Sequence, residues 1–144
     1  MGYATLSDLE RRFGLPELLR FCDRDRDGVP DAETVAQLLA DADSEINSYL
    51  AGRYALPLAE PFDPLLTAIA CNLVRLAYQG GGSETQSPAE TAAKLARQQL
   101  KDLADGRAVL AGTGTAGQPA QGGEAQFVAP EPVFTPHAMA GWLP

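Results

Sequence analysis

The sequence predicts an all-α fold, a bundle of about four helices followed by an extended C-terminal arm. Three observations predict it: apolar residues recur at helical spacing over most of the chain, helix-capping residues stand at several expected boundaries, and Ala111–Gly123 contains only Gly, Thr, Ala, Gln and Pro. We therefore expect two parts, a helical bundle over residues 1–110 and a Gly/Pro-rich loop with a docking arm over residues 111–144.

Two short helices are expected at the start of the chain. Thr5 and Asp8 have the spacing of a capping box, in which each side chain accepts a hydrogen bond from the other residue's amide, and Gly14 should end the helix that follows. A second short helix is expected over Pro16–Phe21, because proline suits the first turn of a helix.

The longest predicted helix begins at Asp31, acting as its N-cap, and ends near Tyr54, because Pro57 disfavours the helical conformation in the residue before it. Its apolar residues recur at helical spacing and form one stripe. They are Val35, Leu38, Leu39, Ala42, Ile46, Tyr49 and Leu50.

Two further helices complete the predicted bundle. One, over Pro64–Tyr78, is apolar on most sides, which predicts a central place among the helices. The other begins with a capping box formed by Ser87 and Glu90, and Gly106 follows its end. Its predicted buried seam consists of Ala92, Leu95, Ala96, Gln99, Leu100 and Leu103.

The composition argues against nucleic-acid-binding and membrane proteins. With 19 acidic and 11 basic residues, the net charge is −8, whereas tight binding of a phosphate backbone needs clustered Lys and Arg. The chain has no stretch of about 18 apolar residues and no signal peptide, so we expect a protein made and kept in the cytoplasm. Cys22 and Cys71 are interpreted as buried hydrophobic residues; a disulfide between them is allowed but not indicated.

Four aspartates ahead of the longest helix have the spacing of a calcium-binding loop. They are Asp23, Asp25, Asp27 and Asp31, at loop positions 1, 3, 5 and 9. Gly28 stands where such a loop needs a sharp turn, but Thr34 occupies position 12, where a bidentate glutamate belongs. Arg24 and Arg26 can also neutralise the aspartates without a metal ion. The competing interpretation is a turn whose aspartates cap the next helix.

No catalytic set is recognisable, and we predict neither an enzyme activity nor a cofactor. His137 is the only histidine and no acid follows it within four residues, so a role as general base is not indicated. Neither cysteine has a nearby base in the sequence to activate its thiol. The glycine runs lack the Lys and Ser/Thr of a phosphate-binding loop.

The last stretch of the chain carries large apolar residues separated by Pro and Ala. These candidate partner-binding residues are Phe127, Val128, Val133, Phe134, Met139, Trp142 and Leu143. A solvated tail gains nothing from such residues, which favours an arm that docks on a neighbouring subunit. The equally weighted alternative is that they fold back onto the bundle of their own chain.

Several segments resemble a known family. They are Met1–Thr5, Arg12–Gly14 with Glu17-Leu18, the turn Asp23–Asp31, the stretch EINSYLAGRYALPL (Glu45–Leu58), and Leu103–Gly106. Together they resemble the Mu-like phage and prophage head–tail connector (adaptor) family, long carried as a domain of unknown function. The resemblance covers nearly the whole chain, and its most specific part is Glu45–Leu58.

The resemblance implies a structural protein of the virion neck, assembled in the host cytoplasm. Members of such a family are α-helical, form a homo-oligomeric and typically dodecameric ring beneath the portal protein, and send a C-terminal arm into the portal or a neighbour. The tail-side partner would be another neck protein or the tail terminator, and DNA would pass through the ring. Two other functions stay open: a small calcium-binding helical module that uses Asp23–Asp31, and a scaffold protein whose arm captures a partner while the bundle stays monomeric.

Overall fold

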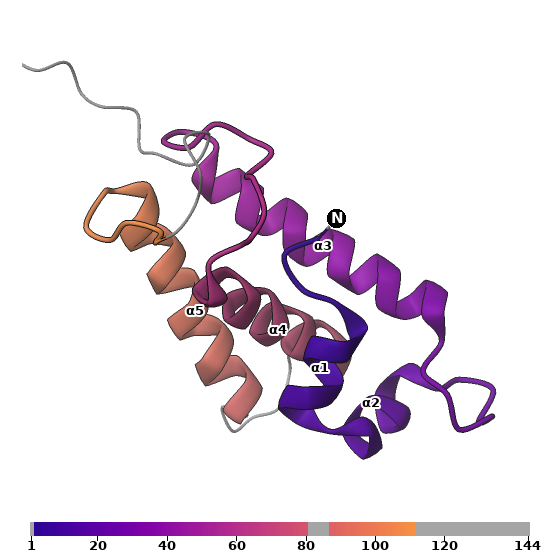
Figure 1. Ribbon diagram of the computed structural model, residues 1–144. Coiled ribbons are helices and arrows are strands. Elements are labelled where there is room, and N and C mark those ends of the chain that lie inside the picture. The colour runs from indigo at the N-terminus through magenta and orange to yellow at the C-terminus, as the bar shows by residue number, and fades with distance from the viewer. Residues whose placement is uncertain (1, 81–86, 112–144) are drawn as a thin grey trace, which may run out of the picture.

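The computed structural model describes residues 2–80 and 87–111, which form five α-helices and no strand (Figure 1). The helices are α1 (Leu6–Phe13), α2 (Leu15–Cys22), α3 (Ala32–Leu50), α4 (Pro64–Gln79) and α5 (Pro88–Ala104). The predicted all-α class is confirmed. The predicted C-terminal arm lies in residues 112–144, outside the described part of the chain.

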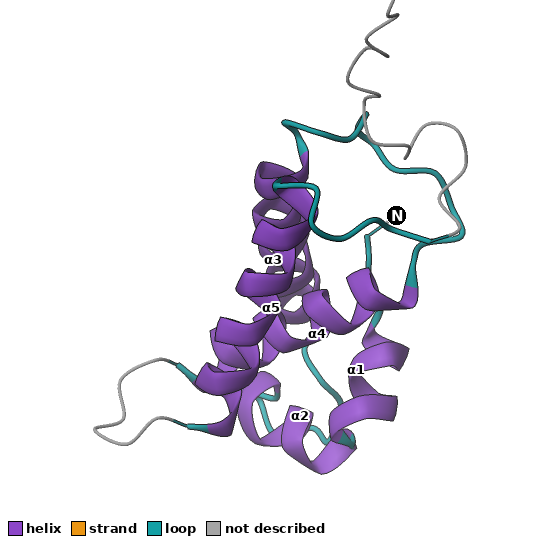
Figure 2. Cartoon of the chain, turned by 90° about the vertical axis from the view of Figure 1, so that its left-hand side faces the viewer, coloured by secondary structure: helices purple, strands orange, loops and turns teal. Residues whose placement is uncertain are grey.

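Helix α4 occupies the centre of the bundle. It packs against each of the other four helices, while α3 and α5 also contact each other and α1 contacts α2 (Figures 1 and 2). The reason is its composition, since six of its residues are buried on several sides of the helix. The predicted central place of this helix is confirmed.

The segment before α1 is fixed across α3 and α4. The Tyr3 amide donates to Asp43 Oδ1 at 3.0 Å, its hydroxyl donates to Asn47 Oδ1, and its carbonyl accepts a 2.9 Å hydrogen bond from Thr67 Oγ1. The Tyr3 ring packs edge-on against Phe62, with 5.1 Å between the ring centroids. Because these partners lie far along the chain, the N-terminal residues help join α3 to α4.

Ion pairs connect helices that are distant in sequence. Glu17 in α2 accepts two hydrogen bonds from Arg75 in α4, with 2.7 Å from Nε to Oε1 and 3.0 Å from Nη2 to Oε2. Glu45 in α3 is paired in the same bidentate way with Arg97 in α5, at 2.6 and 3.2 Å. Two parallel hydrogen bonds fix the relative orientation of the partners as well as their distance.

The helix ends confirm several capping predictions and correct two of them. Both expected capping boxes, at the starts of α1 and α5, are present. Asp31 is the N-cap of α3, but its side chain makes no capping hydrogen bond; its carboxylate accepts from the Arg24 amide instead. Helix α3 ends at Leu50 rather than near Tyr54, because the Arg53 amide donates to the Leu50 carbonyl, three residues back, and tightens the chain into a turn.

The buried side of α5 differs from the predicted seam. Its buried residues are Ala89, Ala93, Ala96, Leu100 and Leu103. Leu95, which we expected in the seam, is 61% exposed. The predicted seam combined residues from two faces of α5. The face that packs against α4 and α3 is the one that carries Ala89, Ala93 and Ala96.

No helix in residues 2–80 and 87–111 is long and apolar enough to cross a membrane. Cys22 and Cys71 are both free thiols buried in the core, as the sequence predicted for them. Burial raises the pKa of Cys22 and raises that of Cys71 to about 11, so both thiols stay protonated at neutral pH.

Candidate functional site

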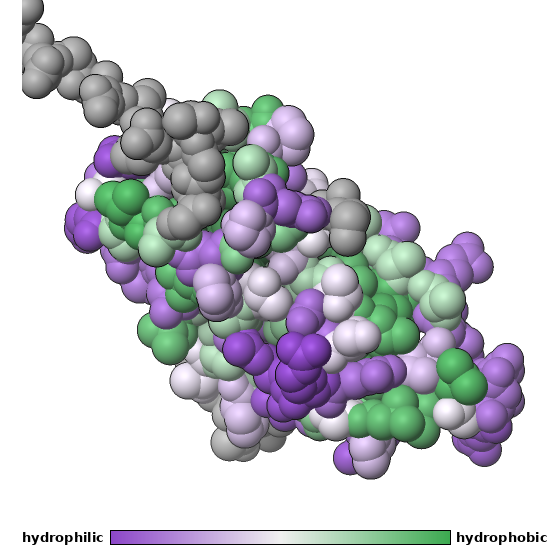
Figure 3. Space-filling model, in the orientation of Figure 1, coloured by the Kyte–Doolittle hydropathy of each residue, from purple (hydrophilic) through white to green (hydrophobic). Residues whose placement is uncertain are grey.

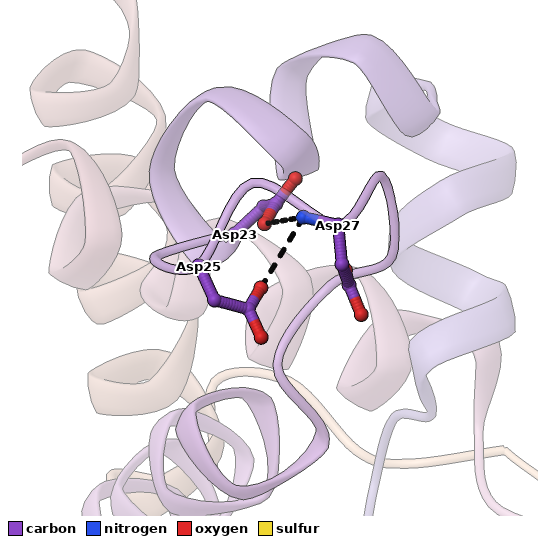
Figure 4. Close-up of side chains that lie close together, drawn as sticks. All are labelled: Asp23, Asp25 and Asp27. Carbon is purple, nitrogen blue, oxygen red and sulfur yellow. Dashed lines mark hydrogen bonds between the residues drawn. The ribbon is translucent and has the colours of Figure 1, made fainter.

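The aspartate loop lies between α2 and α3 and is shown in Figure 4. The side chains of Asp23 and Asp25 both face the Asp27 amide, which donates to them at 3.2 and 3.3 Å. The Gly28 amide donates to the other oxygen of Asp23 at 3.1 Å, and the Val29 amide donates to Asp27 at 2.8 Å. The carboxylates therefore organise the turn through its own backbone amides.

Three of the four predicted calcium ligands converge. Asp23, Asp25 and Asp27 each place one carboxylate oxygen within 4.8 Å of the others. Asp31 is not in this group, since its carboxylate is held by the Arg24 amide. The Asp27 amide favours the charged form of Asp25, but desolvation and the surrounding carboxylates outweigh it and raise the pKa of Asp25.

The opposite end of α3 carries a second group of functional candidates. We call it the exit end: it consists of the turn 51–63 and residues 105–111, which lie together at one end of the bundle (Figures 1 and 2). The aspartate loop is roughly 28 Å away, the length of a 19-residue helix. The two candidate sites are therefore separate surfaces of the molecule.

The last described residues are anchored at the exit end. Asp63 accepts a hydrogen bond from the Leu65 amide at 2.8 Å, which caps α4, and another from the Ala111 amide at 2.7 Å. Leu110 is buried in the core beside this contact. Residues 105–111 are thus part of the packed bundle, and Asp63 fixes the point from which the C-terminal residues leave it.

Arg53 and Tyr54 occupy the same end. The Arg53 guanidinium lies against the Cα of Gly106, where an added Cβ would be 2.8 Å from Arg53 Nη2. Gly106 also has φ +76°, a conformation that favours glycine. Tyr54 is 3% exposed, and among residues 2–80 and 87–111 neither its hydroxyl nor Arg53 Nε has a hydrogen-bond partner. Within the described residues, neither side chain makes a hydrogen bond to the Leu56–Leu58 turn that follows them.

The stretch Glu45–Leu58, which carries the most specific resemblance, is mainly structural. Glu45 pairs with Arg97 and Asn47 accepts from Tyr3, while the apolar residues of the stretch enter the core. Those core residues are Ile46, Leu50, Tyr54 and Leu58. The motif therefore encodes the contacts of α3 with its neighbours and the shape of the exit end.

The bundle surface offers no broad apolar face in the view of Figure 3. Hydrophilic residues gather over α1 and the aspartate loop, and smaller hydrophobic areas lie between them. The large apolar residues that are exposed in the described part are scattered, namely Leu15, Val29, Leu95 and Val109. Scattered residues of this kind do not form a docking patch by themselves.

The predicted partner-binding residues, Phe127 to Leu143, and the histidine His137 lie outside the described residues. Sequence reasoning also missed contacts that the bundle uses. Asp63 and Arg53 carried no motif that marked them as partners of Ala111 and Gly106, because each pair is separated by about a third of the chain. Of these four residues, only Gly106 was marked by the sequence, because a glycine just beyond a helix end is typical of a helix C-terminus.

The described residues form a small helical bundle in which Ala111, the last of them, is hydrogen-bonded to Asp63 at the exit end. The chain belongs to the protein family described as Bacteriophage Mu, Gp36, whose model matches residues 3–129. A relative in Escherichia phage Mu, "Gene product J", is 33% identical over 108 residues, which cover 74% of this chain and 74% of that protein. The predicted membership of a Mu-like phage family is confirmed, and the chain is a phage-related protein.

Proposed function

We propose that this chain is a structural protein of a tailed phage, a head–tail connector that forms a homo-oligomeric ring between the portal protein and the tail. The observation that carries the proposal is membership of a Mu phage protein family over residues 3–129. In this role the ring, dodecameric by the resemblance, stands in the virion neck. Its tail-side partner is another neck protein or the tail terminator, and DNA passes through it without sequence-specific contacts.

The structure of the bundle is compatible with a ring subunit that has to transmit mechanical force. Bidentate ion pairs join α2 to α4 and α3 to α5, and the N-terminal residues join α3 to α4. Residues 105–111 are packed into the same body, so a force applied to the C-terminal residues is passed to the core through Leu110 and the Asp63–Ala111 hydrogen bond. We propose that the residues beyond this point form the arm that docks on a neighbour.

Deletion of Phe127–Pro144 tests this proposal in the phage or prophage that encodes the chain. The expected result is a folded bundle, with unchanged helical circular dichroism, and a loss of tailed particles in electron micrographs. A matched control that shortens only Gly112–Gly117 should still give tailed particles. Normal tailed particles from the deletion would refute the docking arm.

A calcium-binding module is distinguished by titration calorimetry of the full chain. Saturable heat at micromolar calcium that disappears in Asp25→Ala would favour the calcium module. The connector proposal expects no such heat, because Thr34 replaces the bidentate ligand of the loop. A partner-capturing scaffold is distinguished by electron microscopy of particles made without this protein. If the protein were such a scaffold, its removal would still leave heads joined to tails.

A further inference from the structure

A groove between α1 and the start of α4 combines positive charge with apolar surface. Its volume is about 380 Å³, within the range of pockets that hold a small ligand, about 300–1,000 Å³. Arg11 and Arg12 of α1 line it, and both are exposed. Phe62 and Pro64 supply apolar lining from the other side. Figure 3 shows the hydrophilic surface that α1 presents here.

The two guanidinium groups of this groove are available to a ligand. Within the described residues, the Arg12 side chain makes no hydrogen bond or ion pair, and Arg11 only approaches Asp8, at 3.9 Å, which is too long for a hydrogen bond. The other oxygen of Asp8 is engaged by the amide and hydroxyl of Thr5. A ligand that brings carboxylates and an apolar side chain would therefore match the groove.

The aspartate loop of the same chain has this chemistry. Asp25 and Asp27 are exposed, and one oxygen of each accepts no hydrogen bond from the described residues. Carboxylate oxygens of both lie within 4.8 Å of Asp23, and like charges this close favour a cation beside them. Val29, next in the loop, is 59% exposed. Because backbone amides already hold the loop in shape, binding it costs little ordering.

The loop and the groove are different surfaces of the chain. The loop extends past the ends of α2 and α3 (Figure 1), and none of its residues lines the groove of its own chain. A contact between them therefore joins two copies head to tail. Repetition of such a contact closes a ring when the rotation between subunits closes, and otherwise continues as a filament.

We propose that the aspartate loop of one subunit enters the groove of the next, where Asp25 and Asp27 pair with Arg11 and Arg12 and Val29 packs against the apolar lining. This inference rests on the proposed function, since it assigns residues to the contact between subunits of the homo-oligomeric ring. The cation that the loop takes up is then a guanidinium of a second copy.

Charge reversal in the full chain, followed by sedimentation velocity, tests the proposal. Arg12→Glu and Asp25→Arg should each weaken self-association about tenfold or more, as expected for the loss of one charge-assisted pair. Asp25 is the better loop position to change, because Asp23 also binds the Asp27 amide and keeps the turn. Combining both substitutions in one chain should restore association. An equal mixture of the two single variants should also associate, since each supplies the complement that the other lacks.

Lys94→Glu is the matched control. It changes the net charge by the same amount as Arg12→Glu, at an exposed position of α5 outside the groove, and should leave association unchanged. Circular dichroism reports whether each variant is folded. Equal losses in Lys94→Glu and Arg12→Glu would overturn the proposal, as would a double variant that does not recover. An unaltered chain that stays monomeric up to about 1 mM, or that associates only with added calcium, would overturn it too.

The contact and the connector function can fail separately. If these substitutions do not affect association but particles without the protein have unjoined heads and tails, this inference fails and the connector proposal stands. If the substitutions control association but particles without the protein have normal tails, the connector proposal fails and the contact between copies stands.

Discussion

Gly106→Ala should destabilise the bundle by two separable mechanisms. Gly106 has φ +76°, where a side chain is strained, and its Cα lies against the guanidinium of Arg53. An added Cβ would be 2.8 Å from Nη2, well inside a normal contact distance. The guanidinium has to move, but the enclosed Nε restricts how it can do so.

The magnitude follows from these two effects. The left-handed conformation costs an alanine about 1–2 kcal/mol relative to glycine. Displacing the packed guanidinium adds about 1 kcal/mol, the low end of the range for overpacking, because the obstacle is the end of a long side chain. The free energy of unfolding should therefore fall by about 2–3 kcal/mol. In an Arg53→Ala background, Gly106→Ala should lower the free energy of unfolding only by the cost of the left-handed conformation, about 1–2 kcal/mol.

Urea denaturation of the four proteins in this cycle, followed by circular dichroism, measures both effects. The expected coupling between Gly106 and Arg53 is about 1 kcal/mol, as for residues in direct contact. Equal destabilisation by Gly106→Ala in both backgrounds would refute the contact. A loss below about 0.5 kcal/mol in both would refute the strained conformation as well.

Three further predictions concern the core and its ion pairs. Tyr54→Phe should leave the free energy of unfolding within about 0.5 kcal/mol of the unaltered chain or raise it, because the buried hydroxyl has no partner to lose in the part of the chain that the structure describes. Desolvation raises the pKa of Glu17, but hydrogen bonds from Arg75 and Tyr78 outweigh it, so the pKa is lowered. The stability that the Glu17 carboxylate contributes is therefore present above about pH 4.5 and is lost as the pH falls through the lowered pKa. Glu17→Gln should therefore lose less stability than the unaltered chain between about pH 5 and 3. Cys22 and Cys71 should resist iodoacetamide at neutral pH in the native protein and react in denaturant, as mass spectrometry can show.

Each of these predictions has its own control. Tyr3→Phe removes a hydroxyl that does have a partner, Asn47, and should destabilise the bundle where Tyr54→Phe does not. Equal acid sensitivity of Glu17→Gln and the unaltered chain would contradict the role of the ion pair. Rapid modification of either cysteine in the native state would contradict its burial.

The local parts of the fold could be predicted because their causes are local. The capping boxes at Thr5 and Ser87 depend on residues three positions apart, and the apolar surface of Pro64–Gln79 predicts a central helix by itself. The end of α3 was predicted too late, since the proline signal at Pro57 acts several residues after the turn at Leu50–Tyr54 has already formed.

The long-range contacts could not be read in the same way. Glu45 and Arg97, or Asp63 and Ala111, are about 50 residues apart, and no spacing rule connects them. The aspartate loop lies between these cases. Its spacing predicted that Asp23, Asp25 and Asp27 converge, but the position of Asp31 depends on whether its carboxylate caps α3 or accepts from Arg24. The sequence contains both options, and packing decides between them.

The proposed function of this protein is to join phage heads to tails. Electron microscopy of particles produced by the encoding phage or prophage after removal of this gene tests it most directly. The connector account predicts assembled heads and assembled tails that are not joined, with joining restored when the unaltered gene is supplied from a plasmid. Normal tailed particles in the absence of the protein would contradict the account.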